Sequence, residues 1–196
     1  MFVAFCRLIF RLRGWKTAGL IPVPDAAKRC VMIAVPHTTN WDAIYTIACF
    51  DMMGIKWRFT IKKEWLKPPF GGILKSLGAI GIDRSPRKEG EQRPSTVEAM
   101  ARLFEEHEQL CIVVTPEGTR SVVKEWKMGF YHVAKMAGVP IALGYMDYAR
   151  KEAGLGKIIY PSDDIAADMR QIMDFYKTIT PKFPENFSLD VRYKGE

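Results

Sequence analysis

The 196-residue chain lacks several features that mark common classes of protein. No uninterrupted apolar run reaches the 18 or more residues that a membrane-spanning helix needs, so no transmembrane segment is predicted. It also contains no internal repeat, no low-complexity segment and no linker that would divide it. These absences exclude repeat and fibrous architectures and favour a single domain.

Cysteine and histidine are scarce and scattered. No two cysteines form a CxxC pair and each lies in an apolar stretch, so we expect buried free thiols and a reducing cytosol. The histidines lie far apart and lack metal-ligand spacing, so no metal site is expected. The residues are Cys6, Cys30, Cys49 and Cys111, with His37, His107 and His132.

Positive charge is in excess. The net charge of +7 and the pI near 9.2 suit an acidic partner, such as a phosphorylated small molecule, an anionic membrane or nucleic acid. The basic residues are dispersed and no recognition motif is present, which argues against nucleic acid. With 48% hydrophobic residues, the chain can bury a sizeable core.

The N-terminal stretch MFVAFCRLIFRLRGWK combines apolar and basic residues. Arg7 and Arg11 interrupt the apolar run, which makes it a poor signal peptide. At helical spacing, the face opposite these arginines carries Phe5, Leu8, Ile9, Leu12 and Trp15. This pattern predicts an amphipathic helix within residues 1–20 that lies in a membrane interface. The alternative is a helix docked on the core with its arginines in solvent.

Strand and helix patterns alternate through residues 21–196. Strands are predicted at residues 29–37, 56–62, 78–84, 111–115, 139–148 and 156–160. Helices are predicted at residues 41–53, 70–78, 96–109, 130–138 and 165–180, with a polar loop at 85–95. This alternation predicts one α/β domain with a largely parallel central sheet and helices on both faces.

Three polar motifs directly follow predicted strands. They are PHTTNWD, DRS and PEGTRS. In open α/β sheets, ligands bind in the crevice beyond the carboxyl ends of the strands. The three motifs could therefore share one pocket.

His37 and Asp42 stand with four residues between them. An imidazole can accept a proton near neutral pH, and a carboxylate in the first helical turn can hold one ring nitrogen, as in hydrolytic triads. Because no serine lies in a GxSxG elbow, the pair suits a dyad that activates a hydroxyl of the substrate. The alternative is that Thr39 or Asn40 caps the helix, Asp42 favours its dipole, and His37 packs in a turn.

The PEGTRS motif offers donors for a phosphate. Gly118 permits a tight turn with exposed N–H groups, and Thr119 and Arg120 add further donors. Arg84 could supply a second positive group from a neighbouring strand end. The alternative is an ordinary surface turn with a solvated arginine, and Lys62 in TIKKEW is by itself more typical of a solvated lysine.

In this order, HTTNWD, GAIGIDR, PEGTRS and VPIALG resemble the four motif blocks of the glycerolipid acyltransferase family. Lysophosphatidic acid acyltransferases are the best-known branch of that family. The resemblance covers roughly residues 30–148. The histidine-x4-aspartate block is weak alone, but its combination with a downstream proline-glutamate-glycine-threonine-arginine block is specific.

The resemblance implies a role for each matching residue. His37 matches the general base that deprotonates the acceptor hydroxyl, and Asp42 matches the carboxylate that orients it. Lys62 matches a basic residue placed after the second strand, where it could help stabilise the oxyanion. The phosphate of the acceptor is assigned to Arg84, Glu117, Gly118, Thr119 and Arg120. No metal or prosthetic group is implied, and acyl-CoA or acyl carrier protein is the co-substrate.

Three positions depart from the family pattern. Pro36 stands where many members carry asparagine, Thr115 stands where an aromatic is common, and VPIALG lacks a second proline. The dyad and Arg120 are retained, so we expect an active enzyme whose contacts to the acceptor or the acyl chain differ.

The expected function is acylation of lysophosphatidic acid in phospholipid biosynthesis. The protein would work peripherally, at the cytoplasmic face of an anionic membrane. One alternative is the same chemistry on the hydroxyl of another lysolipid, an amino-lipid or a glycan lipid. A second is an inactive module that binds anionic lipid, against which the retained His37 and Asp42 argue.

Overall fold

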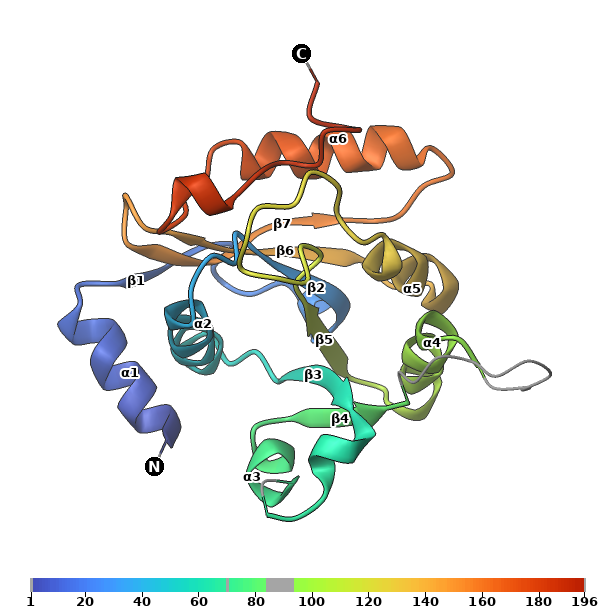
Figure 1. Ribbon diagram of the computed structural model, residues 1–196, viewed down its shortest axis with the longest axis horizontal. Helices are drawn as coiled ribbons and strands as arrows, with labels where there is room; N and C mark the ends of the chain where they lie inside the picture. Colours follow the sequence, from blue (N-terminus) through green and yellow to red (C-terminus); the bar gives the residue numbers. More distant parts are fainter. Residues whose placement is uncertain (1, 70, 84–93, 196) are drawn as a thin grey trace.

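The computed structural model describes residues 2–69, 71–83 and 94–195 (Figure 1). Its strands are β1 (Lys16–Gly19), β2 (Arg29–Val35), β3 (Trp57–Lys62), β4 (Ala79–Ile82), β5 (Leu110–Val114), β6 (Ile141–Asp147) and β7 (Glu152–Ile159). Within these residues they form one seven-stranded sheet in the order β1-β7-β6-β2-β5-β3-β4. Every neighbouring pair is parallel except β6 and β7.

Helices cover both faces of this sheet (Figure 1). The α-helices are α1 (Phe2–Leu12), α2 (Trp41–Met52), α3 (Gly71–Ser76), α4 (Thr96–Glu106), α5 (Gly129–Ala137) and α6 (Ile165–Tyr176). Short 3-10 turns are η1 (Asp25–Lys28), η2 (Lys63–Leu66) and η3 (Pro184–Asn186). One face packs against α1 and α2, and the other against α4, α5 and α6. The predicted α/β class is confirmed.

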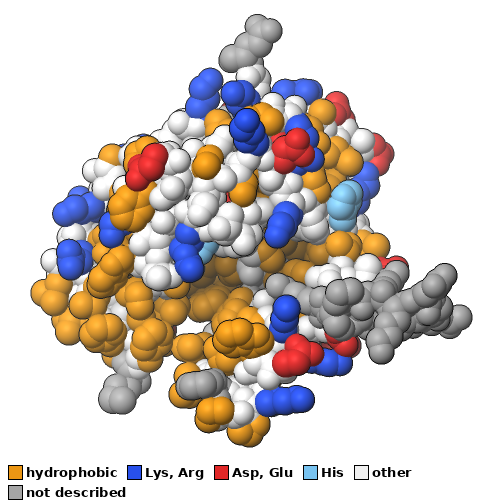
Figure 2. All heavy atoms as spheres, in the orientation of Figure 1, with side chains coloured by type: hydrophobic (Ala, Val, Ile, Leu, Met, Phe, Trp, Pro, Cys, Tyr) orange, Lys and Arg blue, Asp and Glu red, His pale blue; other side chains and the backbone are white. Residues whose placement is uncertain are grey.

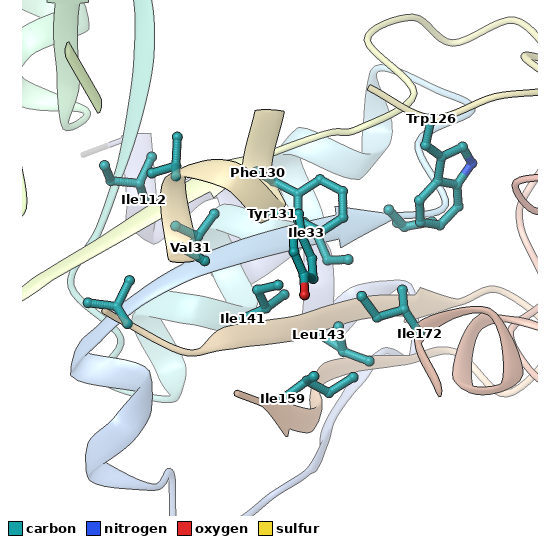
Figure 3. Close-up of a cluster of buried hydrophobic side chains, with 14 of the residues drawn as sticks. Val31, Ile33, Ile112, Trp126, Phe130, Tyr131, Ile141, Leu143, Ile159 and Ile172 are labelled. Carbon is teal, nitrogen blue, oxygen red and sulfur yellow. The ribbon is translucent and has the colours of Figure 1, made fainter. Parts of the chain in front are cut away.

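Strand β2 lies at the centre of the sheet and is buried on both faces. Val31, Ile33 and Val35 point into the core beneath α4, α5 and α6, part of which is shown in Figure 3. Cys30 and Met32 point to the opposite core, beneath α1 and α2. Burial on both faces explains why this segment is continuously apolar instead of alternating with polar residues.

The predicted strands and helices are present, with their ends shifted by a few residues. All four cysteines are buried and free, as predicted. Two features were missed. The short strand β1 has no apolar alternation and joins the sheet edge through β7, and the β6–β7 pairing is antiparallel. The polar loop expected at residues 85–95 lies mostly outside the described residues.

Helix α1 is docked on α2. Cys6 and Phe10 are fully buried against the core, and Arg7 Nη1 lies 3.1 Å from Asp51 Oδ2. The helix ends at Leu12, so the prediction that Trp15 belongs to its apolar face is wrong: Trp15 lies beyond the helix and is buried. No helix in the described ranges has the length and apolar character to cross a bilayer.

Docking of α1 leaves part of its apolar surface uncovered. Phe5 and Leu8 are about half exposed, and Leu12 is 73% exposed. Residues 16–19 pair with β7, so the sheet begins before residue 21. The helix therefore both contributes to the core and presents apolar side chains outward.

Candidate active site

The HTTNWD and PEGTR motifs leave the carboxyl ends of β2 and β5, which are adjacent and parallel. Residues of both motifs line one pocket of about 530 Å³. For these two motifs, the predicted common pocket is confirmed. In the third motif, DRS, the structure describes Asp83, whose Oδ2 lies 2.7 Å from Lys63 Nζ. Arg84 lies outside the described residues.

His37 and Asp42 face each other at the polar end of this pocket. Nδ1 of His37 lies 3.2 Å from Oδ2 of Asp42, whose carboxylate is almost completely buried. The same oxygen accepts the backbone N–H groups of Thr38 and Thr39 at 2.9 Å each. With Nδ1 directed at the carboxylate, Nε2 is the ring nitrogen left to receive a proton from a substrate.

The capping alternative accounts for only part of this geometry. Asn40 occupies the N-cap position of α2 but makes no side-chain capping bond. The hydroxyl of Thr39 accepts the Trp41 N–H at a long 3.4 Å. The Asp42 carboxylate instead fixes the loop that carries His37, so it supports the loop and orients the ring together.

Tyr148 holds the second oxygen of the same carboxylate. Its hydroxyl donates to Oδ1 of Asp42 at 2.6 Å. Burial, and then the nearby carboxylate, raise the pKa of Tyr148 above its ordinary value, so it stays a donor. No sequence motif pointed to this residue, which follows β6 just after the VPIALG block.

Glu117 lies beneath the His37 loop. Both of its carboxylate oxygens accept the backbone N–H of His37, at 3.1 and 3.2 Å. The residue is only 5% exposed, and this burial raises its pKa to about 7. The structure thus places Glu117 as a support for the backbone of the loop that carries His37 and not on the pocket wall.

Gly118 turns the chain at the pocket. Its φ of +68° favours glycine, and its N–H donates to the Thr115 carbonyl at 3.0 Å. Both residues line the pocket. The expected tight turn is therefore present, and it brings the PEGTR backbone next to the dyad. The expectation of an exposed N–H at Gly118 is wrong, because this group is bound within the turn.

Thr119, Arg120 and Lys62 are exposed and do not line the pocket. Arg120 Nη1 donates to Asn40 Oδ1 at 2.5 Å, which ties the PEGTR loop to the loop that carries His37. Lys62 ends β3. Their roles toward the substrate remain predictions.

Away from the dyad the pocket is apolar. Its walls there are formed by α2, β3, β5, β6 and the residue after α3, through Ile47, Trp57, Phe59, Leu77, Val113, Val114 and Met146. Lys127, which the sequence did not single out, lines the polar end. A pocket with one charged end and a long apolar remainder suits an amphiphilic ligand.

A family model described as "Acyltransferase" matches residues 19–142, more than half of the chain. The chain belongs to this acyltransferase family. The structure of the acyltransferase is similar to that of the 1-acyl-sn-glycerophosphate (LPA) acyltransferase PlsC from Thermotoga maritima. The TM-score is 0.59 at 15% identity, with 89% of this chain and 74% of the other covered, which supports the fold. No curated protein sequence matches the chain.

Exposed apolar side chains of the acyltransferase lie on the elements to either side of the pocket. Figure 2 shows hydrophobic side chains gathered on both sides of a hollow below the centre of the molecule. Among the exposed large apolar side chains are Phe5, Leu8 and Leu12 of α1, Trp65 of η2 and Ile73 of α3. The pocket is therefore flanked by surface that water solvates poorly.

A cluster of aromatic and basic side chains lies next to the dyad. Trp41, which precedes Asp42, is 39% exposed. The Arg13 guanidinium lies 5.7 Å from the centre of its ring, and the Lys182 ammonium lies 6.0 Å from it. An indole with flanking cations is well suited to the boundary between lipid headgroups and acyl chains.

Proposed function

We propose that this acyltransferase moves a fatty acyl chain from acyl-CoA or acyl carrier protein to the free hydroxyl of 1-acyl-sn-glycerol-3-phosphate. The observation that carries the proposal is the His37–Asp42 pair, 3.2 Å apart, at the polar end of an otherwise apolar pocket. The family membership supports acyl transfer, and the likeness to a solved LPA acyltransferase supports this acceptor.

In the proposed reaction, His37 acts as general base. Nε2 takes the proton of the acceptor hydroxyl while that oxygen attacks the thioester carbonyl. Asp42 stabilises the imidazolium that forms and keeps the ring in its orientation. The tetrahedral intermediate collapses, the carbon–sulfur bond breaks, and the proton passes from the imidazolium to the departing thiolate. The products are the diacyl phospholipid precursor and a free thiol, and the acyl thioester is the only co-substrate.

The proposed place of the reaction is the cytoplasmic surface of an anionic membrane. The exposed face of α1, with Phe5, Leu8 and Leu12, supports insertion among acyl chains. Arg13 and Lys182 beside Trp41 support contact with anionic headgroups, as does the net charge of +7. A single-chain lipid could then pass from the membrane into the pocket without crossing water.

The test is release of free thiol from acyl-CoA or acyl carrier protein in the presence of lysophosphatidic acid. We expect His37→Ala to lower the rate roughly 10²–10⁴-fold, the usual contribution of a general base. His132→Ala, at an exposed position on α5, is the matched control and should leave the rate unchanged. Full thiol release by His37→Ala would refute the general-base role.

A panel of acceptors separates lysophosphatidic acid from the alternatives. Lysolipids with other headgroups, amino-lipids and glycan lipids are offered with the same donor. A kcat/KM for one of them far above that for lysophosphatidic acid would overturn the proposed acceptor while leaving the chemistry in place.

A further inference from the structure

Lys127 reaches the pocket from the segment between the PEGTR turn and α5. Its backbone N–H donates to the Pro116 carbonyl at 2.9 Å, which fixes the residue against the motif. Its side chain lies over Gly118. A Cβ at position 118 would stand 2.8 Å from Nζ and 3.2 Å from Cε of Lys127. The absence of a side chain at Gly118 therefore leaves the space that the Lys127 ammonium occupies.

Among the residues that the structure describes, Lys127 is the one lysine or arginine that lines the pocket. The other basic residues of the described motifs lie elsewhere: Arg120 donates to Asn40, and Lys62 is exposed at the end of β3. No salt bridge to Lys127 is found in the described ranges. Its positive charge is thus available to a ligand in the pocket.

The chemistry of the proposed acceptor places its phosphate near this charge. When the acceptor hydroxyl is at His37, the phosphate lies only a few bonds away and must remain at the polar end. Apart from the dyad and Lys127, the polar side chains that line the pocket are the neutral Thr46, Thr60 and Thr115. An ammonium is a strong point-charge partner for phosphate.

We infer that Lys127 binds the phosphate of the acceptor and so makes the enzyme select a phosphate monoester over a neutral glyceride. This inference rests on the proposed function, since it names the group that recognises the acceptor at the same site. It gives Lys127 a role in specificity, distinct from the chemical step at His37.

The test compares Lys127→Met, which keeps the length of the side chain and removes its charge, with Lys127→Arg. Each variant is assayed with lysophosphatidic acid and with a monoacylglycerol of the same chain. Because a hydrogen bond to a charged group contributes about 1.5–3 kcal/mol, Lys127→Met should raise the KM for lysophosphatidic acid roughly 10–100-fold. Turnover of monoacylglycerol and the KM for the donor should stay within about twofold, and Lys127→Arg should recover much of the loss.

Lys124→Met is the matched control, because Lys124 is exposed in the same segment and does not line the pocket. It should behave as the wild type. Equal losses with both acceptors would place Lys127 at the oxyanion and overturn the inference, as would an unchanged KM for lysophosphatidic acid.

A binding measurement separates this inference from the proposed function. Titration calorimetry with sn-glycerol 3-phosphate should give binding to the wild type and weaker binding to Lys127→Met. If the wild type acylates no lysophosphatidic acid, the proposed function fails, yet a loss of glycerol 3-phosphate binding in Lys127→Met still supports a phosphate site. Equal binding to both proteins, or none to the wild type, overturns the inference.

Discussion

The hydroxyl of Tyr148 donates a 2.6 Å hydrogen bond to Asp42, on the carboxylate oxygen that does not face His37. The Tyr148 ring lies edge-on against Trp15, with ring centres 4.8 Å apart, and Trp15 follows α1. The orientation of the dyad therefore depends on a residue far away in the sequence, and through it on the packing of the N-terminal segment.

We expect Tyr148→Phe to weaken catalysis without removing it. Loss of the donor removes one of the contacts that hold the Asp42 carboxylate, so the ring of His37 is held less firmly in the orientation that proton transfer needs. We expect kcat to fall roughly 10–100-fold, in line with the roughly 1.5–3 kcal/mol of a hydrogen bond to a charged group. Tyr160→Phe, at an exposed position, is the control. A kcat equal to that of the wild type would show that the Tyr148 hydroxyl does not support the dyad.

The raised pKa of Glu117 predicts a pH dependence of folding. The pKa of Glu117 is about 7 in the folded protein and 4.5 in the unfolded chain. Between these two pH values the folded protein therefore retains a proton that the unfolded chain has lost. The resulting stabilisation is complete below about pH 4.5 and disappears as the pH rises through about 7. A shift of this size corresponds to about 3 kcal/mol.

Glu117→Gln carries no titrating group and should flatten this dependence. Urea unfolding of the wild type and the variant at pH 5 and pH 8 measures the difference in slope. Glu105→Gln, on the exposed side of α4, should keep the slope of the wild type. Parallel pH dependences for Glu117→Gln and the wild type would show that this carboxylate does not titrate as its burial indicates.

The exposed face of α1 predicts membrane binding that depends on apolar area. Replacing Leu8 and Leu12 together by serine should weaken sedimentation with anionic vesicles about 10-fold or more, since each buried leucine contributes about 1.5–3 kcal/mol. Both side chains are exposed, so the fold should persist. Met136→Ser, which alters an exposed apolar residue of α5, is the control. Vesicle binding unchanged by the double substitution would place the membrane contact elsewhere.

The sequence alone determined the class of fold and the core of the site. The apolar run of β2 and the helical spacing of α2 are local patterns, and they predicted both elements. His37 and Asp42 lie within one loop and one helical turn, so their spacing predicted their contact, which the structure confirms at 3.2 Å. The PEGTR motif follows a neighbouring parallel strand, and its approach to the dyad was therefore also predictable.

The tertiary structure decided what depends on strand order and packing. Tyr148 meets Asp42 across 106 residues, and Glu117 meets His37 across 80, so no local pattern could indicate either contact. Lys127 enters the pocket because the chain folds back on Pro116 and crosses Gly118.

Helix α1 was ambiguous because amphipathic spacing is the same for docking on a core and for lying on a membrane. Its packing against α2 buried Cys6 and Phe10 and left Leu8 and Leu12 outside. Periodicity fixes which residues share a face, but only the assembled sheet fixes what each face meets.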